Sequence, residues 1–146
     1  MSASVAMNDQ TIFTALRSLI LLVIDGVEVI QGLGNGVPLP AGEFIAMTEI
    51  ARPRLATNIR DETGGVSQHS DCQIQIDCYG ENANSHAQIL STLLRDTYAC
   101  DNMPSDIQPL YCDDLKQIPI TNGEQQYEKR WQLIAHLQIN PTVVFN

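Results

Sequence analysis

A chain of 146 residues with 44% hydrophobic residues is predicted to fold as one domain, residues 1–146, around a core that needs no disulfide or metal. Its 17 acidic against 8 basic side chains give a formal charge of -9, which argues against the basic surface that usually supplies non-specific affinity for nucleic acid. The N-terminus lacks the basic region of a secretory signal and the longest apolar run, Leu19 to Ile24, is too short to span a membrane, so we expect a soluble protein made in the cytoplasm.

The first predicted element is an amphipathic helix from about Asp9 to Ile24, in which apolar residues recur at helical spacing. Asn8 or the first residue of that range can cap its start, and Gly26 can end it. Leu21 and Leu22 widen the apolar stripe beyond what one core needs. Part of this helix surface is therefore a candidate contact with another subunit.

A short strand is expected from Val27 to Ile30, followed by a turn-rich connection that reaches Gly42. The glycines of this connection do not form a nucleotide-binding loop, because Val37 stands where GxGxxG needs its last glycine and GxxxxGK[ST] is absent. We predict a loop here, without a cofactor.

Two strand-like runs follow, Glu43 to about Thr57 and Val66 to Tyr79. The second run has the period of a strand with one buried and one polar face, because polar residues alternate with Cys72, Ile74, Ile76 and Cys78. The polar segment NIRDETGG between the two runs suits the tip of a long β-hairpin. Pro53 removes a donor, so the first run is expected to be an edge strand or to be interrupted there.

A second helix is predicted from about Asn84 to Ala99, with Ser85 and Gln88 at the spacing of a capping box. Short strands are expected at about Leu110 to Cys112 and at about Gln117 to Thr121.

The last predicted strand ends at Asn140-Pro141 and has its apolar positions at Trp131, Leu133, Ala135, Leu137 and Ile139. Trp131 is expected to anchor the core. The order α, β, β, β, α, β predicts an α+β fold: a mainly antiparallel β-sheet with an N-terminal helix and a second helix packed on one face, and a long β-hairpin.

The histidines and serines give no enzyme motif, since neither GxSxG nor HExxH occurs. His69, His86 and His136 fall on different predicted elements. His69, Ser70 and Asp71 are the residue types of a catalytic triad, but neighbours on a strand point to opposite faces. We therefore predict that the chain is not an enzyme and has no catalytic residue.

Metal and disulfide sites are not predicted either. Six residues of extended strand separate Cys72 from Cys78 by roughly 20 Å, too far for one metal or one disulfide. The remaining cysteines, Cys100 and Cys112, complete no CxxC pair. No calcium loop is formed by the carboxylates at Asp101, Asp106, Asp113, Asp114 and Glu124.

Charged side chains cluster at the expected hairpin tip. Arg52, Arg54 and Arg60 stand close in sequence to Asp61 and Glu62, and arginine is the cation preferred for geometrically specific ion pairs. These five residues are candidates for a contact with an identical neighbour, which in a ring joins two different patches. The alternative interpretation is a solvated charged loop.

The chain resembles the phage neck and tail-terminator-like proteins of contractile- and long-tailed phages in four successive segments: VEVIQGLGNGVPLPAGEFIAM, RPRLATN, QIQIDCYGENANSHAQIL and QYEKRWQLIAHLQINP. These segments lie within residues 25–142, and their order and spacing carry the resemblance. The short N-terminus departs from the family and leaves open which contacts a head-side partner uses.

The resemblance implies a ring, usually a hexamer, at the head-proximal end of the tail tube in the virion neck. The ring would stop tube polymerisation and join the tail to the head. Its expected partners are further copies of itself, the tail tube protein and a head-completion or connector protein, and genome DNA would pass through its centre without specific binding. The net charge of -9 fits a wall along which DNA slides without sticking.

Four other interpretations remain open. A head-completion protein and a tail tube subunit belong to the same structural class. A small hydrolase or metal-dependent enzyme requires the scattered His and Asp residues to converge, and a monomeric binding module requires a single small species at all concentrations.

Overall fold

A mixed sheet forms the centre of the computed structural model, which describes residues 2–32, 42–118, 120–121 and 127–145. The order of its main strands is β2-β3-β6-β11-β7, and β8 also pairs with β11. The pairing of β2 with β3 is parallel and the other pairings are antiparallel. The strands are β2 (Glu28–Gln31), β3 (Phe44–Ala51), β6 (Ser70–Tyr79), β7 (Ile107–Cys112), β8 (Lys116–Gln117) and β11 (Arg130–Ile139).

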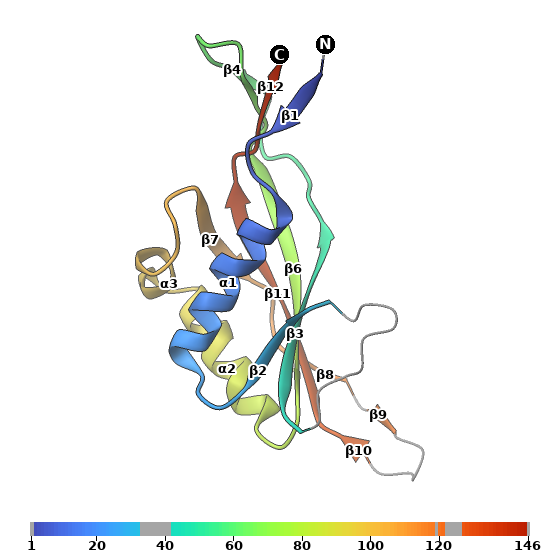
Figure 1. The fold of residues 1–146 in the computed structure, drawn as a ribbon. Coiled ribbons are helices and arrows are strands. Elements are labelled where there is room, and N and C mark those ends of the chain that lie inside the picture. The colour runs from blue at the N-terminus through green and yellow to red at the C-terminus, as the bar shows by residue number, and fades with distance from the viewer. Residues whose placement is uncertain (1, 33–41, 119, 122–126, 146) are drawn as a thin grey trace.

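Two helices, α1 (Asp9–Val23) and α2 (Ala83–Leu94), lie on one face of this sheet (Figure 1). Their apolar stripes and the alternate residues of the strands form one buried cluster, in which Leu16, Leu90 and Ile76 are at most 1% exposed. The predicted α+β fold, with a mainly antiparallel sheet and helices on one face, is confirmed. None of the described helices is long and apolar enough to cross a membrane.

The first helix begins where the sequence predicts. The Asn8 side chain accepts a hydrogen bond from the Thr11 amide at 2.9 Å, so Asn8 is the cap. Ile24 follows the last helical residue, and Gly26 then turns the chain with a φ of 72°. Leu22 is 57% exposed and Leu21 36% exposed on the outer side of α1.

The predicted second helix is wrong in its extent. It stops at Leu94, and a short helix α3 (Thr97–Asp101) follows, because the Asp96 carboxylate accepts the Tyr98 amide at 3.0 Å and starts a new helix. The capping box also fails to form, since the residue before α2 is Asn82 and its side chain makes no cap hydrogen bond.

The long hairpin is confirmed. Strands β3 and β6 pair from Phe44 with Tyr79 to Ala51 with Gln73, with a register shift near the far end. β3 ends at Ala51, so the strand is interrupted at Pro53 as expected, and β2 flanks β3 only from Phe44 to Met47. Beyond Pro53 the hairpin continues into β4 (Ile59–Arg60) and β5 (Val66–Ser67), which pair around its tip.

A second sheet projects from one end of the molecule (Figure 1). Its order is β1-β12-β5-β4, and it adds the two terminal strands, β1 (Ala3–Val5) and β12 (Thr142–Phe145), to the hairpin tip. We call this four-stranded sheet the arm, and the rest of the molecule the body. Neither terminal strand was expected from the sequence.

The remaining predictions had mixed outcomes. Trp131 is only partly buried and packs against the edge of the core, so it is a weaker anchor than expected. The strand expected at about Gln117 to Thr121 is divided into β8 and β9 (Ile120–Thr121), and β9 pairs with β10 (Tyr127–Glu128). Most of the glycine-rich connection, residues 33–41, lies outside the described residues.

Candidate functional site

The Asp61 carboxylate closes the turn at the tip of the arm. Its Oδ1 accepts hydrogen bonds from the Thr63 amide at 2.9 Å, the Thr63 hydroxyl at 2.8 Å and the Gly65 amide at 2.8 Å. The Thr63 hydroxyl, followed by the Gly65 amide, holds the pKa of Asp61 below its ordinary value. Since these donors use the side chain of Asp61 within its own turn, its main role in the described structure is to shape the tip.

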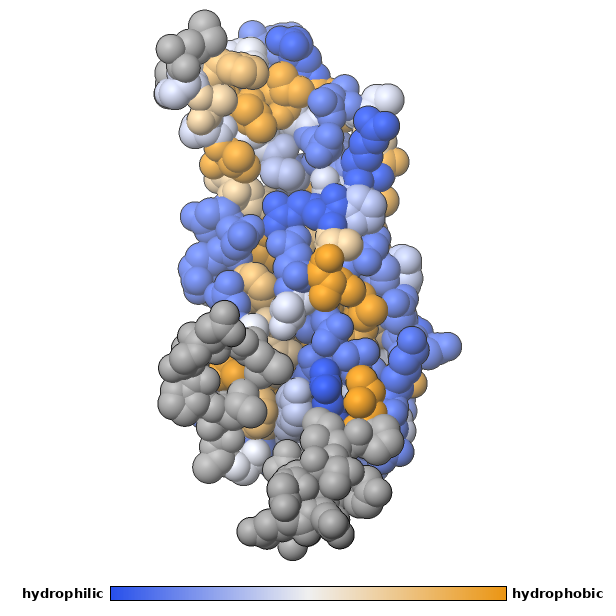
Figure 2. All heavy atoms as spheres, turned by 90° about the vertical axis from the view of Figure 1, so that its right-hand side faces the viewer, coloured by the Kyte–Doolittle hydropathy of each residue, from blue (hydrophilic) through white to orange (hydrophobic). Residues whose placement is uncertain are grey.

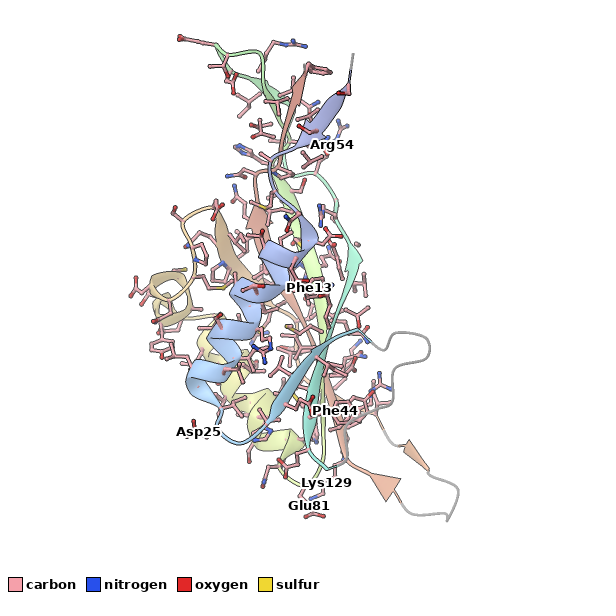
Figure 3. All side chains as sticks on the ribbon, in the orientation of Figure 1. Phe13, Asp25, Phe44, Arg54, Glu81 and Lys129 are labelled. Atoms are coloured by element: carbon pink, nitrogen blue, oxygen red, sulfur yellow. The ribbon has the colours of Figure 1, made fainter. Side chains whose placement is uncertain are left out.

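Three other candidate residues are exposed on or near the arm. Arg60 lies in β4 and Glu62 follows in the turn, while Arg54 lies at the base of the arm, where its backbone bridges to Ser70 (Figure 3). In the part of the chain that the structure describes, the side chains of Arg54, Arg60 and Glu62 make no hydrogen bond or ion pair. These three side chains are available to a partner.

Arg52, by contrast, is engaged within the chain. Its Nε and Nη2 atoms donate to the two Glu49 carboxylate oxygens, each at 2.7 Å, and Nη2 also donates to Asp9 Oδ1 at 3.0 Å. The hydrogen bonds to Glu49 raise the pKa of Arg52 further above its ordinary value. Arg52 therefore fastens the start of α1 to the end of β3, directly beneath the arm.

The thiol of Cys72 completes this cluster from the core side. Its Sγ donates to Glu49 Oε2 at 3.0 Å. Burial, and then the hydrogen bond to the Glu49 carboxylate, raise the pKa of the Cys72 thiol to about 12. The thiol remains protonated at neutral pH and acts as a donor inside the fold.

The predicted contact residues thus divide into two groups. Arg54, Arg60 and Glu62 are exposed and unpaired within the described residues, whereas Arg52 and Asp61 already bind groups of their own chain. Part of this division is local in sequence, since Glu49 lies close before Arg52 and Thr63 and Gly65 lie close after Asp61. The bond from Arg52 to Asp9, 43 residues away, gives no such signal.

The face of the sheet opposite the helices is mainly polar across its middle (Figure 2). Asp77, whose side chain is 2% exposed, accepts hydrogen bonds from Arg130 Nε at 3.0 Å, Arg130 Nη2 at 2.9 Å and Gln132 at 3.1 Å. Gln75 donates to its other oxygen at 2.9 Å. These partners compensate the desolvation of the buried carboxylate.

His136 forms a second polar cluster on the same face. Its Nδ1 lies 2.9 Å from Asp71 Oδ2, and its Nε2 lies 3.0 Å from Asp113 Oδ1. The ring stacks on Tyr111 with centroids 4.1 Å apart. His136 thus joins a carboxylate of β6 to one that follows β7, which suits a structural role.

The side chains predicted not to form a triad are indeed directed elsewhere. Asp71 binds His136 and not His69, and the Ser70 hydroxyl donates to the Gln68 carbonyl at 3.1 Å. Among the described residues, no group of three His, Cys, Asp or Glu side chains could hold a metal ion, and Glu124 lies outside them. The four cysteines are free, and Cys100 is the exposed one.

Two open grooves flank the helices. One has a volume of about 740 Å³ and lies between the first half of α1 and the segment from Asp101 to Pro104. The other, of about 510 Å³, lies between α2 and β11 and is lined in part by Ile89, Leu115 and Trp131. Asp101 is the one acidic or basic side chain among the residues that line these two grooves, so neither groove brings acid-base groups together as an active site does.

Comparison with protein families gives a match over nearly the whole chain. A family model with the description "Phage neck terminator protein" matches residues 10–145, which include the body and all of the arm except β1. No curated protein matches the chain.

Proposed function

The chain belongs to the phage neck terminator protein family, and we propose that it forms a ring, expected to be a hexamer, which ends the tail tube and joins the tail to the head. The family match over residues 10–145 carries this proposal. It makes the protein a component of the virion neck, and a structural family favours a role without catalysis.

The charge of the chain is compatible with a ring through which DNA passes. The formal charge is -9, and on the described part of the helix-free face Arg130 is bound to Asp77 of its own chain, which leaves Lys116 as an exposed cation there. A surface with few free cations does not hold the phosphate backbone. We therefore expect an acidic ring of this kind to let DNA slide through its centre.

We propose that the charged loop from Arg52 to Gly65 lies at the boundary between two copies of the chain. Arg54, Arg60 and Glu62 are the members of that loop whose charges remain available for ion pairs with a neighbour. Arg52 and Asp61 support the contact indirectly, because they fix the base and the tip of the arm. Contacts repeated around a closed ring act together even when each is weak.

Depletion of this protein in an infected cell tests the proposed role. A ring that ends the tube predicts tails of uncontrolled length, and heads that remain unjoined to them, in electron micrographs of the lysate. Restoring the chain from a plasmid is the control and is expected to return tails to a uniform length.

The same micrographs separate the proposal from its competitors. Tails of uniform length beside heads that have lost their DNA would favour a head-completion protein and contradict a terminator. If no tail tubes formed, the result would favour the interpretation that the chain is a tail tube subunit. Unaltered particles would contradict every role in the neck.

A further inference from the structure

The arm has one broad face that is almost wholly apolar. Residues that pair directly across antiparallel strands point to the same side of a sheet. The pairs Ala3 with Phe145, Val5 with Val143, Val143 with Val66 and Val66 with Arg60 therefore define one face. We call it the apolar arm face, and its members are Ala3, Val5, Arg60, Val66, Val143 and Phe145.

The opposite face of the arm is different in character. Ser4 pairs with Val144, and Thr142 with Ser67, which pairs in turn with Ile59. The Ser67 and Thr142 hydroxyls bond each other at 2.7 Å. This side therefore has polar groups that suit contact with water, whereas the apolar arm face has none apart from Arg60.

No helix in the described part of the chain covers the apolar arm face. The three described helices, α1, α2 and α3, lie on the body, and Val5 and Phe145 are each 55% exposed (Figure 1). The arm strands have two to four residues, too few for a sheet that is independently stable in water without a packed face. An exposed apolar surface of this kind marks a site of interaction.

The composition of the apolar arm face points to an acidic protein as its partner. It contains an aromatic ring and an arginine but no Asp, Glu or Lys, which is the composition found at the centres of protein interfaces. Arg60 has no partner among the described residues. The chain itself is acidic, with a formal charge of -9, so another copy of it offers the complementary charge.

The body has unpaired acids that meet this requirement. Asp25 and Glu81 lie at the end of the molecule opposite the arm, together with Lys129 (Figure 3). Neither carboxylate makes an ion pair within the described residues. The arm and its base, by contrast, carry Arg54 and Arg60 against Asp61 and Glu62, so together they approach an acidic body without net repulsion.

We propose that the apolar arm face packs on the body of a second copy of the chain. This inference rests on the proposed ring, and it adds that the terminal strands β1 and β12, and not the charged loop alone, supply the contact. Joining an arm to a body is a heterologous contact, the kind that closes a ring when it is repeated.

The mass of the full-length chain, measured by light scattering over a range of concentrations, tests this contact. Phe145→Ser and Val5→Ser remove apolar area from the proposed face. Ile59→Ser is the matched control, because Ile59 is 51% exposed on the opposite face of the same arm. Before the mass is measured, circular dichroism is used to check that each variant is folded.

We expect the original chain and Ile59→Ser to assemble equally, and Phe145→Ser to require about tenfold more protein for half-assembly, as loss of a buried aromatic contact predicts. An oligomer that survives both Phe145→Ser and Val5→Ser would overturn the arm contact but leave the ring intact. A chain that stays monomeric throughout would overturn both. A dimer that only Ile59→Ser disrupts would likewise contradict the contact and the ring.

Discussion

Arg52 and Glu49 form a two-pronged ion pair, with both nitrogen to oxygen distances at 2.7 Å, at the point where the arm leaves the sheet. The same guanidinium reaches Asp9 in the first turn of α1. One side chain thus ties the helix to the strand that leads into the arm. The stability of the body and the position of the arm therefore depend on a shared group.

Replacement of Arg52 by alanine is expected to destabilise the fold by about 1–3 kcal/mol, because Glu49 then loses both charge-assisted donors in a part-buried position. Solvent screening of the ion pair favours the lower part of this range of destabilisation, since the Arg52 side chain is 31% exposed. Urea unfolding followed by circular dichroism measures the change. Lys116→Ala, which removes an exposed cation from the body, should leave the midpoint in place, and an equal shift in both variants would contradict this role of Arg52.

The thiols are expected to differ sharply in reactivity. Burial raises the pKa of Cys72 and of Cys78 to about 12, and Cys112 is buried as well, whereas Cys100 is exposed. A thiol-specific chromogenic reagent at pH 8 should therefore titrate one thiol quickly in the native protein and all four after denaturation. The fast reaction should disappear in Cys100→Ser. Rapid labelling of Cys72 in the native state would show that the cluster beneath the arm opens readily.

The tip of the arm should loosen in acid. The pKa of Asp61 is lowered in the folded protein, mainly by the Thr63 hydroxyl, so its ionised form stabilises the turn above the ordinary value of 3.8. This contribution is lost as the pH falls through the lowered pKa, because protonation weakens Oδ1 as an acceptor. Hydrogen exchange of the Thr63 and Gly65 amides measures the effect.

Asp61→Ala is expected to reproduce that loosening at neutral pH without a change in global stability, because the side chain contacts only its own turn. Glu62→Ala is the neighbouring control, since Glu62 has no partner within the described residues. If both variants exchanged at the rate of the original chain, the Asp61 carboxylate would not shape the tip.

The long periodic elements could be predicted from the sequence. Helix α1 has 15 residues with an apolar stripe and a capping asparagine, and strands β6 and β11 each alternate over 10 residues. These signals are local and agree with the tertiary packing. The end of the second helix was mispredicted because apolar residues continue at helical spacing past Arg95. The Asp96 side chain instead accepts a hydrogen bond from the Tyr98 amide, which ends α2 and caps a new helix.

The arm could be predicted only in part. Its hairpin is local, and the glycines at its tip give a turn signal. Its terminal strands, β1 and β12, have three and four residues, too few to show a period, and they pair the two ends of the chain, Ala3 with Phe145. The charged residues of the loop could be identified by residue type. Their local partners, Glu49 for Arg52 and Thr63 for Asp61, are near in sequence, but the bond from Arg52 to Asp9 joins distant segments and could not be predicted.

The final prediction concerns Arg54 and Arg60, whose reversal to glutamate should weaken assembly and leave the monomer folded. Both residues are exposed, and neither guanidinium makes a hydrogen bond or ion pair in the described part of the chain. An exposed ion pair contributes about 0–1 kcal/mol. Reversing the charge both removes that attraction and adds repulsion, and it does so at every contact between subunits of the ring. Light scattering at moderate salt should therefore show a smaller mean mass at matched concentration, with an unchanged circular dichroism spectrum.

Because any double reversal makes an acidic chain more acidic, the control must change the net charge equally. Lys116→Glu with Lys129→Glu does so on two exposed cations of the body. If this control weakened assembly as much as the reversal of Arg54 and Arg60, general repulsion between copies would account for the effect. An oligomer that withstood the arm reversal would instead place the contact elsewhere, with the exposed Leu21 and Leu22 of α1 as the next surface to alter. Unfolding of the reversed chain would show that the two arginines support the fold itself.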